Sequence, residues 1–399
     1  MRKIISVVLA ALLFITLFTA VFAGQDSSLS FSGDGSFRIM VFSDTQDDQY
    51  PAYDMLNFVK KSIEQSDPDL IVFTGDLVED SRIGDIGIDD ESFREGVVVE
   101  NKNGDIDHDK TRENIEKAVK PIFDILEKSG VPYALVQGNN DHKCGITNDE
   151  WLEIYSEYPG CLVKDMSPDA EGRIDYNLEI KGSNGKTVFN LWMLDSGKGG
   201  VNDDQIEWYR SASSALTEKN GGEPVPAFFF QHINTADIGN VFEKCNIWDD
   251  GAGFSGGSIY RLNREIATGN NFFTYQPGTT TDEFKAWKEQ GDVIGAFFGH
   301  QHVDGFSGTV DGTEIGFIYG CEFAKIGPYG YRVFTLKEDD ILNYTNEVYV
   351  YEGSVRYGTD RIEKQIDEVY DDYNNPFEKA VGYGLNVFRS IISMIISLF

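Results

Sequence analysis

The stretch Val293-Ile294-Gly295-Ala296-Phe297-Phe298-Gly299-His300-Gln301-His302 joins a continuous apolar run to a closely spaced pair of histidines. Short uninterrupted apolar runs are typical of strands buried on both faces of an α/β sheet. Polar side chains directly after such a run lie at the carboxyl end of the strand, where ligands bind in open α/β sheets. This segment therefore predicts a buried strand that carries His300 and His302 to one edge of a sheet.

Four other apolar runs end in the same way, each with one polar residue of a kind that binds metals. The residues, with the runs before them, are Asp44 after 37–42, Asp76 after 70–75, Asn139 after 133–136 and His232 after 228–231. Of the five histidines in the chain, four lie in or beside these segments: His142, His232, His300 and His302. Packing alone does not explain that concentration, so the five strand ends are predicted to meet at one site.

Strand-like and helix-like patterns alternate over most of the chain, which favours βαβ units and an α/β fold. Strands are expected at residues 37–42, 70–74, 133–137, 174–180, 187–194, 292–298, 313–319 and 331–336, and helices near 52–66, 110–129, 203–217 and 281–290. The acidic segment 79–109 is expected to be a surface loop. Its Asp105-x-Asp107-x-Asp109 pattern mimics a calcium loop, but Lys110 stands where the turn needs glycine, so a helix start fits better.

The 399 residues carry a formal net charge of −32 and are 41% hydrophobic, which is ordinary for a globular protein. Nucleic acids bind to basic surfaces, from which counterions are released, and this acidic chain offers no such surface. Nucleic acid is therefore excluded as a partner. Cations would have to neutralise any anionic substrate.

The two ends of the chain differ from its middle. Residues 1–24 are typical of a secretory signal peptide, and the alternative is a retained membrane anchor; both predict a secreted or extracytoplasmic protein. Residues 25–36 form a polar lead-in, 339–376 an acidic extension and 377–399 an apolar segment. This last segment is too short to span a bilayer. It is expected either to contact a membrane surface or to pack on the protein itself or on a partner.

Four cysteines in an exported chain allow two disulfides. Cys144 and Cys161 bracket a helical stretch and are the expected first pair, which leaves Cys245 and Cys321 as the second. None of the four has the CxxC spacing of a zinc site.

The ordered motifs are specific enough to indicate a family. They are Asp44-Thr45-Gln46, Gly75-Asp76, Gly138-Asn139-Asn140-Asp141, His232 and Gly299-His300-Gln301-His302. Together they resemble the motifs of the calcineurin-like metallophosphoesterases, and most of all those of the purple-acid-phosphatase-related branch that lacks the purple tyrosine. The resemblance implies a metallophosphoesterase domain over residues 37–338. Its fold would be a four-layer α/β sandwich, with two mixed β-sheets flanked by helices.

The resemblance also implies two divalent or transition-metal ions, Fe, Zn or Mn. The implied ligands are Asp44 and His302 for the first ion, Asn139, His232 and His300 for the second, and Asp76 for both. Oxygen and imidazole ligands suit these metals. Two adjoining ions clamp the attacking and leaving oxygens of an in-line displacement by a bridging hydroxide. Alternate residues of an extended segment face opposite ways, so His300 and His302 are expected on a turn that Gly299 permits.

The sequence departs from the family pattern at two positions. Gln46 stands where the first motif usually has histidine, and either its side-chain oxygen or Asp47 would help to bind the first ion. Asn140 stands where the third motif has a histidine that is thought to protonate the leaving group. Asparagine can donate a hydrogen bond to a phosphoryl oxygen but cannot transfer a proton near neutral pH. His142 either takes over this role or is a loop histidine without one.

The expected function is that of an exported, dinuclear-metal-dependent phosphoric-ester hydrolase that prefers small monoesters to diesters. Its catalytic residues would be Asn140, His232 and His142. Two alternatives remain at this point. One is a phosphodiesterase acting on nucleotides or lipid head groups, and the other is a catalytically impaired, metal-binding surface module. The sequence does not indicate an oligomeric state.

Overall fold

The computed structural model describes residues 28–81, 83–84, 93–94, 96–167, 172–255, 257–271, 280–323 and 328–351. The expected signal peptide at 1–24 and the apolar segment at 377–399 lie outside these residues. Within the described ranges, no helix is both long enough and apolar enough to cross a membrane.

The first of two large sheets has five strands. Their spatial order is β18 (Thr345–Val350), β17 (Gly330–Lys337), β2 (Ser36–Phe42), β3 (Leu70–Phe73) and β6 (Tyr133–Leu135). Strands β2, β3 and β6 are parallel to one another, whereas β17 is antiparallel to both of its neighbours. The carboxyl ends of β2, β3 and β6 therefore share one edge of this sheet.

The second large sheet has eight strands. Their order is β1 (Leu29–Ser30), β7 (Tyr176–Lys181), β8 (Thr187–Met193), β9 (Ala227–Gln231), β14 (Val293–Phe298), β16 (Thr313–Phe317), β15 (Ser307–Val310) and β13 (Ala267–Thr268). The central strands β8, β9, β14 and β16 are parallel. Two small sheets accompany the large ones: β10 (Phe242–Lys244), β12 (Ser258–Leu262) and β11 (Gly253–Ser255), and the pair β4 (Ile83–Gly84) and β5 (Phe93–Arg94).

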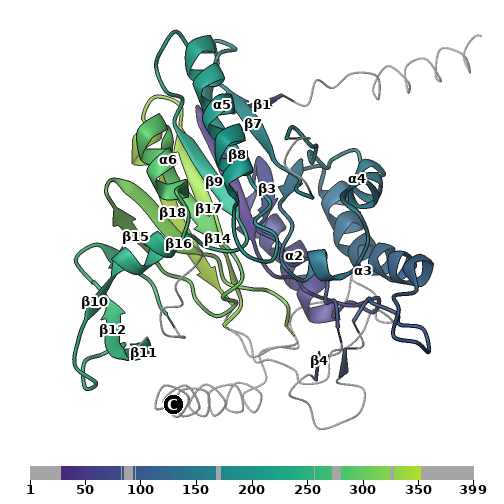
Figure 1. The fold of residues 1–399 in the computed structure, drawn as a ribbon. Helices are drawn as coiled ribbons and strands as arrows, with labels where there is room; N and C mark the ends of the chain where they lie inside the picture. Colours follow the sequence, from purple (N-terminus) through teal and green to yellow (C-terminus); the bar gives the residue numbers. More distant parts are fainter. Residues whose placement is uncertain are drawn as a thin grey trace, which may run out of the picture.

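Helices cover the outer faces of the two large sheets (Figure 1). They are α2 (Tyr53–Ser66) and α3 (His108–Ser129) beside the five-stranded sheet, and α5 (Asp203–Lys219) and α6 (Glu283–Gln290) beside the eight-stranded sheet. Helix α4 (Asn148–Ser156) and the short 3-10 helices η2 (Asp141–Lys143), η3 (Ala236–Val241) and η4 (Ile341–Asn343) lie in the connections.

Strand β9 shows how the layers are packed. Phe228 and Phe230 belong to the core that contains side chains of both sheets, whereas Phe229 belongs to the core that contains α5 and α6. Successive side chains of a strand point to opposite faces, so β9 is buried on both sides. The four layers are thus helices, sheet, sheet and helices, and the predicted α/β sandwich with two mixed sheets is confirmed.

The packed structure extends beyond residues 37–338 at both ends. Strand β1 comes from the polar lead-in and pairs with β7, and β18 comes from the acidic extension and pairs with β17. The predicted helix start after Asp105 is also present. Asp107 is the N-cap of α3, and its side chain accepts a hydrogen bond from the backbone N–H of Lys110.

The predicted disulfides are wrong, because all four cysteines, each within the described ranges, are free thiols. Cys144 is buried and donates through Sγ to the carbonyl oxygen of Asn140 at 3.3 Å. Cys161 follows helix α4, and its backbone forms an isolated parallel β-bridge with Tyr133, the first residue of β6. Cys321 donates to the carbonyl oxygen of Ser43 at 3.2 Å, whereas Cys245 adjoins the small sheet of β10 and β12. The four cysteines therefore have separate contacts in the fold, which their positions in the sequence did not reveal.

Phe228 gives a direct test of the interface between the two sheets. Its fully buried ring lies 4.9 Å from the Phe334 ring of β17 and 4.7 Å from the Tyr344 ring, measured between centroids. We expect Phe228→Ala to lower the free energy of unfolding by about 3–5 kcal/mol, because it leaves a cavity between the sheets. Denaturant unfolding measures this, with Leu342→Ala on the surface as the control. A loss below about 1 kcal/mol would contradict the packing described here.

Candidate metal centre

The two sheets bring five parallel strand ends to one region. Asp44 follows β2, Asp76 follows β3 and Asn139 follows β6, all in the five-stranded sheet. His232 directly follows β9, and the His300–His302 segment follows β14, in the eight-stranded sheet. Each of these strands is anchored by apolar side chains, so the polar residue after it has little freedom to move.

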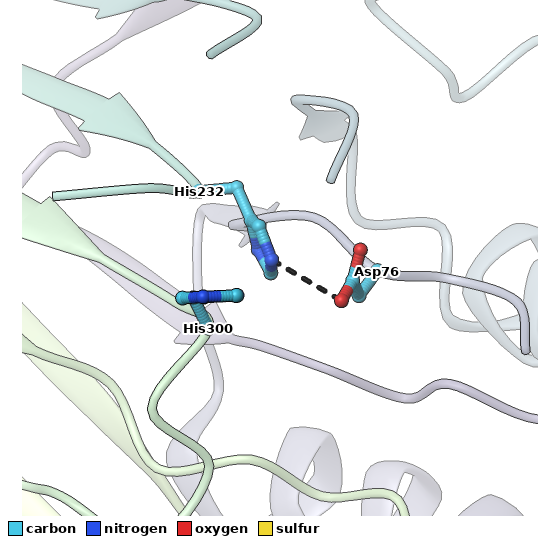
Figure 2. A group of neighbouring side chains, drawn as sticks. All are labelled: Asp76, His232 and His300. Atoms are coloured by element: carbon cyan, nitrogen blue, oxygen red, sulfur yellow. Dashed lines mark ion pairs between the residues drawn. The ribbon is translucent and has the colours of Figure 1, made fainter. Parts of the chain in front are cut away.

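Four side chains form the first group: Asp76, Asn139, His232 and His300. Ligand atoms of Asp76, His232 and His300 all lie within 4.8 Å of one another (Figure 2). His232 Nε2 is 3.2 Å from Asp76 Oδ2 and 3.1 Å from Asn139 Oδ1. With its amide turned the other way, Asn139 Nδ2 donates to His232 Nε2 at 3.1 Å and to His300 Nδ1 at 2.8 Å. One carboxylate, one side-chain amide and two imidazoles therefore face a common point.

The donor set of this group fits a metal ion. A neutral imidazole nitrogen and an amide oxygen repel one another, so either the Asn139 amide turns its Nδ2 toward the rings, or a proton or a cation lies between them. Atoms bound at about 2.0–2.2 Å to one metal are themselves about 3–3.5 Å apart. The contacts of His232 with Asp76 and Asn139 have this spacing, and the ligand atoms of Asp76, His232 and His300 lie within 4.8 Å of one another. The ring of His232 is already oriented for this purpose, because its Nδ1 donates to the carbonyl oxygen of Thr74 at 2.9 Å. Its Nε2 is left to face Asp76.

Asp44, His302 and Glu322 form the second group. His302 Nε2 is 3.6 Å from Asp44 Oδ1, an oxygen that is buried and has no hydrogen-bond partner among the described residues. On its other side, His302 Nδ1 is 3.0 Å from Glu322 Oε1, and this contact orients the ring. A buried carboxylate oxygen without a partner is costly unless a cation lies beside it. This group therefore also fits a metal ion.

The two groups are in direct contact. The backbone N–H of His300 donates to Asp44 Oδ2 at 3.1 Å, and the backbone N–H of Asp44 donates to the carbonyl oxygen of Gly75 at 3.0 Å. The side chains assigned to two ions by the resemblance are thus built on one connected set of loops. Whether Asp76 bridges both ions stays a prediction.

Burial and mutual attraction shift the pKa values of this centre. Burial alone would raise the pKa of Asp76, but the facing His232 lowers it overall. Burial lowers the pKa of His232, and the Asp76 carboxylate more than compensates, to about 9. Burial, aided by the charge of His232, lowers the pKa of His300 to about 4. Burial raises the pKa of Asp44. The positive charge of the centre therefore lies on the protonated His232 ring, and a bound metal cation would replace that proton.

The backbone of the centre is strained. Five of the eight described non-glycine residues with positive φ are predicted ligands: Asp44, Gln46, Asp76, His300 and His302. Such conformations cost about 1–3 kcal/mol each and cluster at functional sites. The turn at His300 and His302 was ascribed to freedom at Gly299, but the positive φ values belong to the histidines. Gly299 is needed for space, because a Cβ there would lie 2.3 Å from Ser43 Oγ.

Gln46 and Asn140 stand at the two positions where the sequence departs from the family pattern. Gln46 is buried, and its backbone N–H donates to the carbonyl oxygen of Asp76 at 2.9 Å. The Asn140 backbone N–H donates to Asp76 Oδ1 at 2.8 Å, and its Nδ2 donates to Asp76 Oδ2 at 3.1 Å. Asn140 therefore holds the Asp76 carboxylate in place.

His142 is paired with Asp195. Its Nε2 lies 2.7 Å and 2.9 Å from the two carboxylate oxygens of Asp195, which also accepts the backbone N–H of Gly197 at 2.8 Å. His142 is not among the residues whose ligand atoms gather around Asp76. Asp195 thus orders the loop and fixes the ring of His142, whose catalytic role stays a prediction.

Three residues of this region were not singled out from the sequence. Glu322 holds His302, and Lys143 donates to Asn140 Oδ1 at 2.6 Å. Asp141 is buried and accepts the backbone N–H groups of Leu77, Val78 and Gly138 at 2.8–3.1 Å. A carboxylate after the predicted strand at 313–319 was the available signal for Glu322. Asp141 was quoted within the third motif, but its contacts are set by the fold.

Glu283, the first residue of α6, makes stability depend on pH. It lies beside Gln231, and burial raises its pKa from 4.5 to about 8. The folded state therefore binds a proton that the unfolded state has lost, so this residue lowers stability as pH rises from 4.5 towards 8. We expect Glu283→Gln to become more stable than the parent over this range, by on the order of a few kcal/mol.

Denaturant unfolding at several pH values measures this effect. The matched control is Glu289→Gln, an exposed residue of the same helix. An unchanged pH slope in Glu283→Gln would contradict the shift.

The sequence was compared with known families and proteins. The family model of the calcineurin-like phosphoesterases matches residues 37–304, a range that contains all the side chains of both groups except Glu322. The chain belongs to the calcineurin-like phosphoesterase family. Divalent metals are implied by this family, and the first group is a matching set of ligands.

Several relatives connect this member of the family with the purple acid phosphatases. "Probable inactive purple acid phosphatase 14" of Arabidopsis thaliana is 24% identical over 82% of this chain and 81% of its own length. "Probable inactive purple acid phosphatase 28" of the same plant is 24% identical over 77% and 73%. Among solved structures, a dimetal phosphatase from Danio rerio covers 80% of this chain and 99% of its own, with 11% identity and a TM-score of 0.44. The predicted purple-acid-phosphatase-related branch is thus confirmed by the sequence relatives.

Proposed function

We propose that this protein is an exported, metal-dependent phosphatase that hydrolyses small phosphomonoesters. The observation that carries the proposal is the convergence of Asp76, Asn139, His232 and His300, with ligand atoms of the carboxylate and the two imidazoles within 4.8 Å of one another. Export rests on the expectation for residues 1–24. The preference for monoesters rests on the expectation drawn from the sequence motifs.

In this proposal the first group would hold one cation, and Asp44 with His302 would hold a second. Divalent cations bound there supply Lewis-acid stabilisation of the phosphoryl oxygens and lower the pKa of water. Residues of the chain orient the ligand side chains. Thr74 and Glu322 fix the rings of His232 and His302, and Asn140 fixes both oxygens of Asp76. Ligands that are held in this way need little rearrangement when substrate binds.

A non-catalytic metal-binding module is the second candidate, and two observations favour it. Gln46 and Asn140 replace histidines of the family pattern, and the Nδ2 of Asn140 is engaged with Asp76. The Arabidopsis relatives are named as probable inactive enzymes. A good leaving group would suffer least from the lost proton donor, since it needs no protonation.

The test is a metal analysis followed by two assays. Elemental analysis of the purified protein gives the metal content, which we expect to approach two ions per chain. Hydrolysis of nitrophenyl phosphate and of bis(nitrophenyl) phosphate is then compared at saturating Zn, Mn or Fe. Faster monoester hydrolysis supports the phosphatase, and faster diester hydrolysis supports a phosphodiesterase. Metal binding without turnover of either ester would support the non-catalytic metal-binding module.

A further inference from the structure

Lys143 places a positive charge at the rim of the first group of ligands. It ends the short helix η2, and its Nζ donates to Asn140 Oδ1 at 2.6 Å. The same Nζ lies 3.3 Å from the amide of Asn139 on the side turned away from the histidine rings. One side chain therefore separates this ammonium group from Asp76, because Asn140 contacts both.

The position of Lys143 is notable because its surroundings are acidic. Asp44, Asp76 and Asp141 are buried in this region, and the whole chain has a net charge of −32. An anionic substrate is repelled by such a field until cations compensate for it. An ammonium group beside the first group of ligands offsets part of this repulsion, in addition to any bound metal.

Lys143 is also available to a ligand. Its side chain is 43% exposed, and its ion pair with Asp80 is long, at 3.8 Å. An ammonium group has three N–H donors. Lys143 donates to Asn140 Oδ1, and it also donates to Asn139 Oδ1 at 3.3 Å when the Asn139 amide is turned to face it with its oxygen. One donor therefore remains for an oxygen atom that enters the centre.

We propose that Lys143 binds a phosphoryl oxygen of the substrate and makes the centre select dianionic phosphomonoesters over monoanionic diesters. This inference rests on the proposed phosphatase function. It assigns Lys143 to substrate binding and to none of the proton transfers. A monoester carries close to two negative charges at neutral pH, because its second pKa is about 6, whereas a diester carries one. The additional charge is what a lysine at this place recognises.

The experiment compares full-length, metal-loaded protein with Lys143→Gln and Lys143→Arg. The first variant removes the charge at similar length, and the second retains it. The control is Lys117→Gln, which removes an exposed lysine that pairs with Glu113 on α3. Calorimetry measures the binding of inorganic phosphate, and kinetics give kcat/KM for nitrophenyl phosphate and for bis(nitrophenyl) phosphate. Elemental analysis and thermal unfolding check metal content and folding.

We expect Lys143→Gln to weaken phosphate binding about tenfold, as the loss of one charged hydrogen bond would do. kcat/KM for the monoester should fall by a similar factor and that for the diester by less than about threefold, because the diester lacks the second charge. Lys143→Arg should recover most of the affinity, and Lys117→Gln should match the parent. Metal content should be unchanged in all variants.

Three results would overturn the inference. They are phosphate affinity unchanged in Lys143→Gln, no phosphate binding by the metal-loaded parent, and an equal loss for both esters. Failure of the phosphatase proposal looks different. If the parent hydrolyses neither ester but Lys143→Gln still binds phosphate about tenfold more weakly, Lys143 is an anion-binding residue of a non-catalytic centre.

Discussion

Asp76→Asn is expected to lower kcat/KM for a phosphomonoester by at least about a thousandfold, since a metal can contribute several kcal/mol to the barrier. The bound metal should fall in parallel. Asparagine has nearly the same size as aspartate, but its single side-chain oxygen accepts only one of the two hydrogen bonds from Asn140. The larger loss is the negative charge that faces His232 at 3.2 Å. Elemental analysis and steady-state kinetics on the same preparation measure both effects.

Asp109→Asn is the matched control, because this aspartate lies exposed in the first turn of α3. It should leave metal content and turnover unchanged. Circular dichroism of Asp76→Asn shows whether the fold is retained. Full activity in a folded Asp76→Asn protein would defeat the proposed metal centre.

The second large effect is expected from restoring the family pattern. The double substitution Gln46→His and Asn140→His should raise kcat by about 10²–10⁴, because a positioned proton donor contributes that much to a reaction with a poor leaving group. The gain should be small for nitrophenyl phosphate and large for an alkyl phosphate. Steady-state kinetics with both substrates measure it. Gln46→His alone is expected to act mainly by tightening metal binding.

Asn246→His, in an exposed loop, controls for the addition of a histidine as such. If the double variant gains activity from a parent that has none, the parent is a binding module. If the parent is active and the alkyl phosphate is hydrolysed no faster by the double variant, the proton comes from elsewhere. His142, held by Asp195, would then be the next residue to replace.

Strands were the most predictable part of this fold. The runs before Asp44, Asp76, His232 and His300 became β2, β3, β9 and β14. A strand that is buried on both faces needs an uninterrupted apolar run, and such a run can be recognised in the sequence alone. The edge strands β1, β13 and β18 and the neighbouring strand β15 were missed, because short or half-exposed strands have no such pattern.

The contacts of the cysteines and of His142 could not be predicted from the sequence. Cys144 and Cys161 are close in sequence, yet each has its own neighbour in the fold. His142 was predicted from its place beside the third motif, but its partner Asp195 comes 53 residues later. Contacts of this kind depend on how loops from different strands are packed, and no local pattern specifies them.

By itself, the sequence determined which strands are buried and which metal-binding side chain follows each of them. Apolar runs and the residues after them are local properties of the chain. Only the tertiary structure decided that the Asn139 amide faces both His232 and His300, that Glu322 orients His302, and that Lys143 reaches Asn140. The reason is physical. These contacts join the ends of two sheets, and their distances exist only after the sheets have packed face to face.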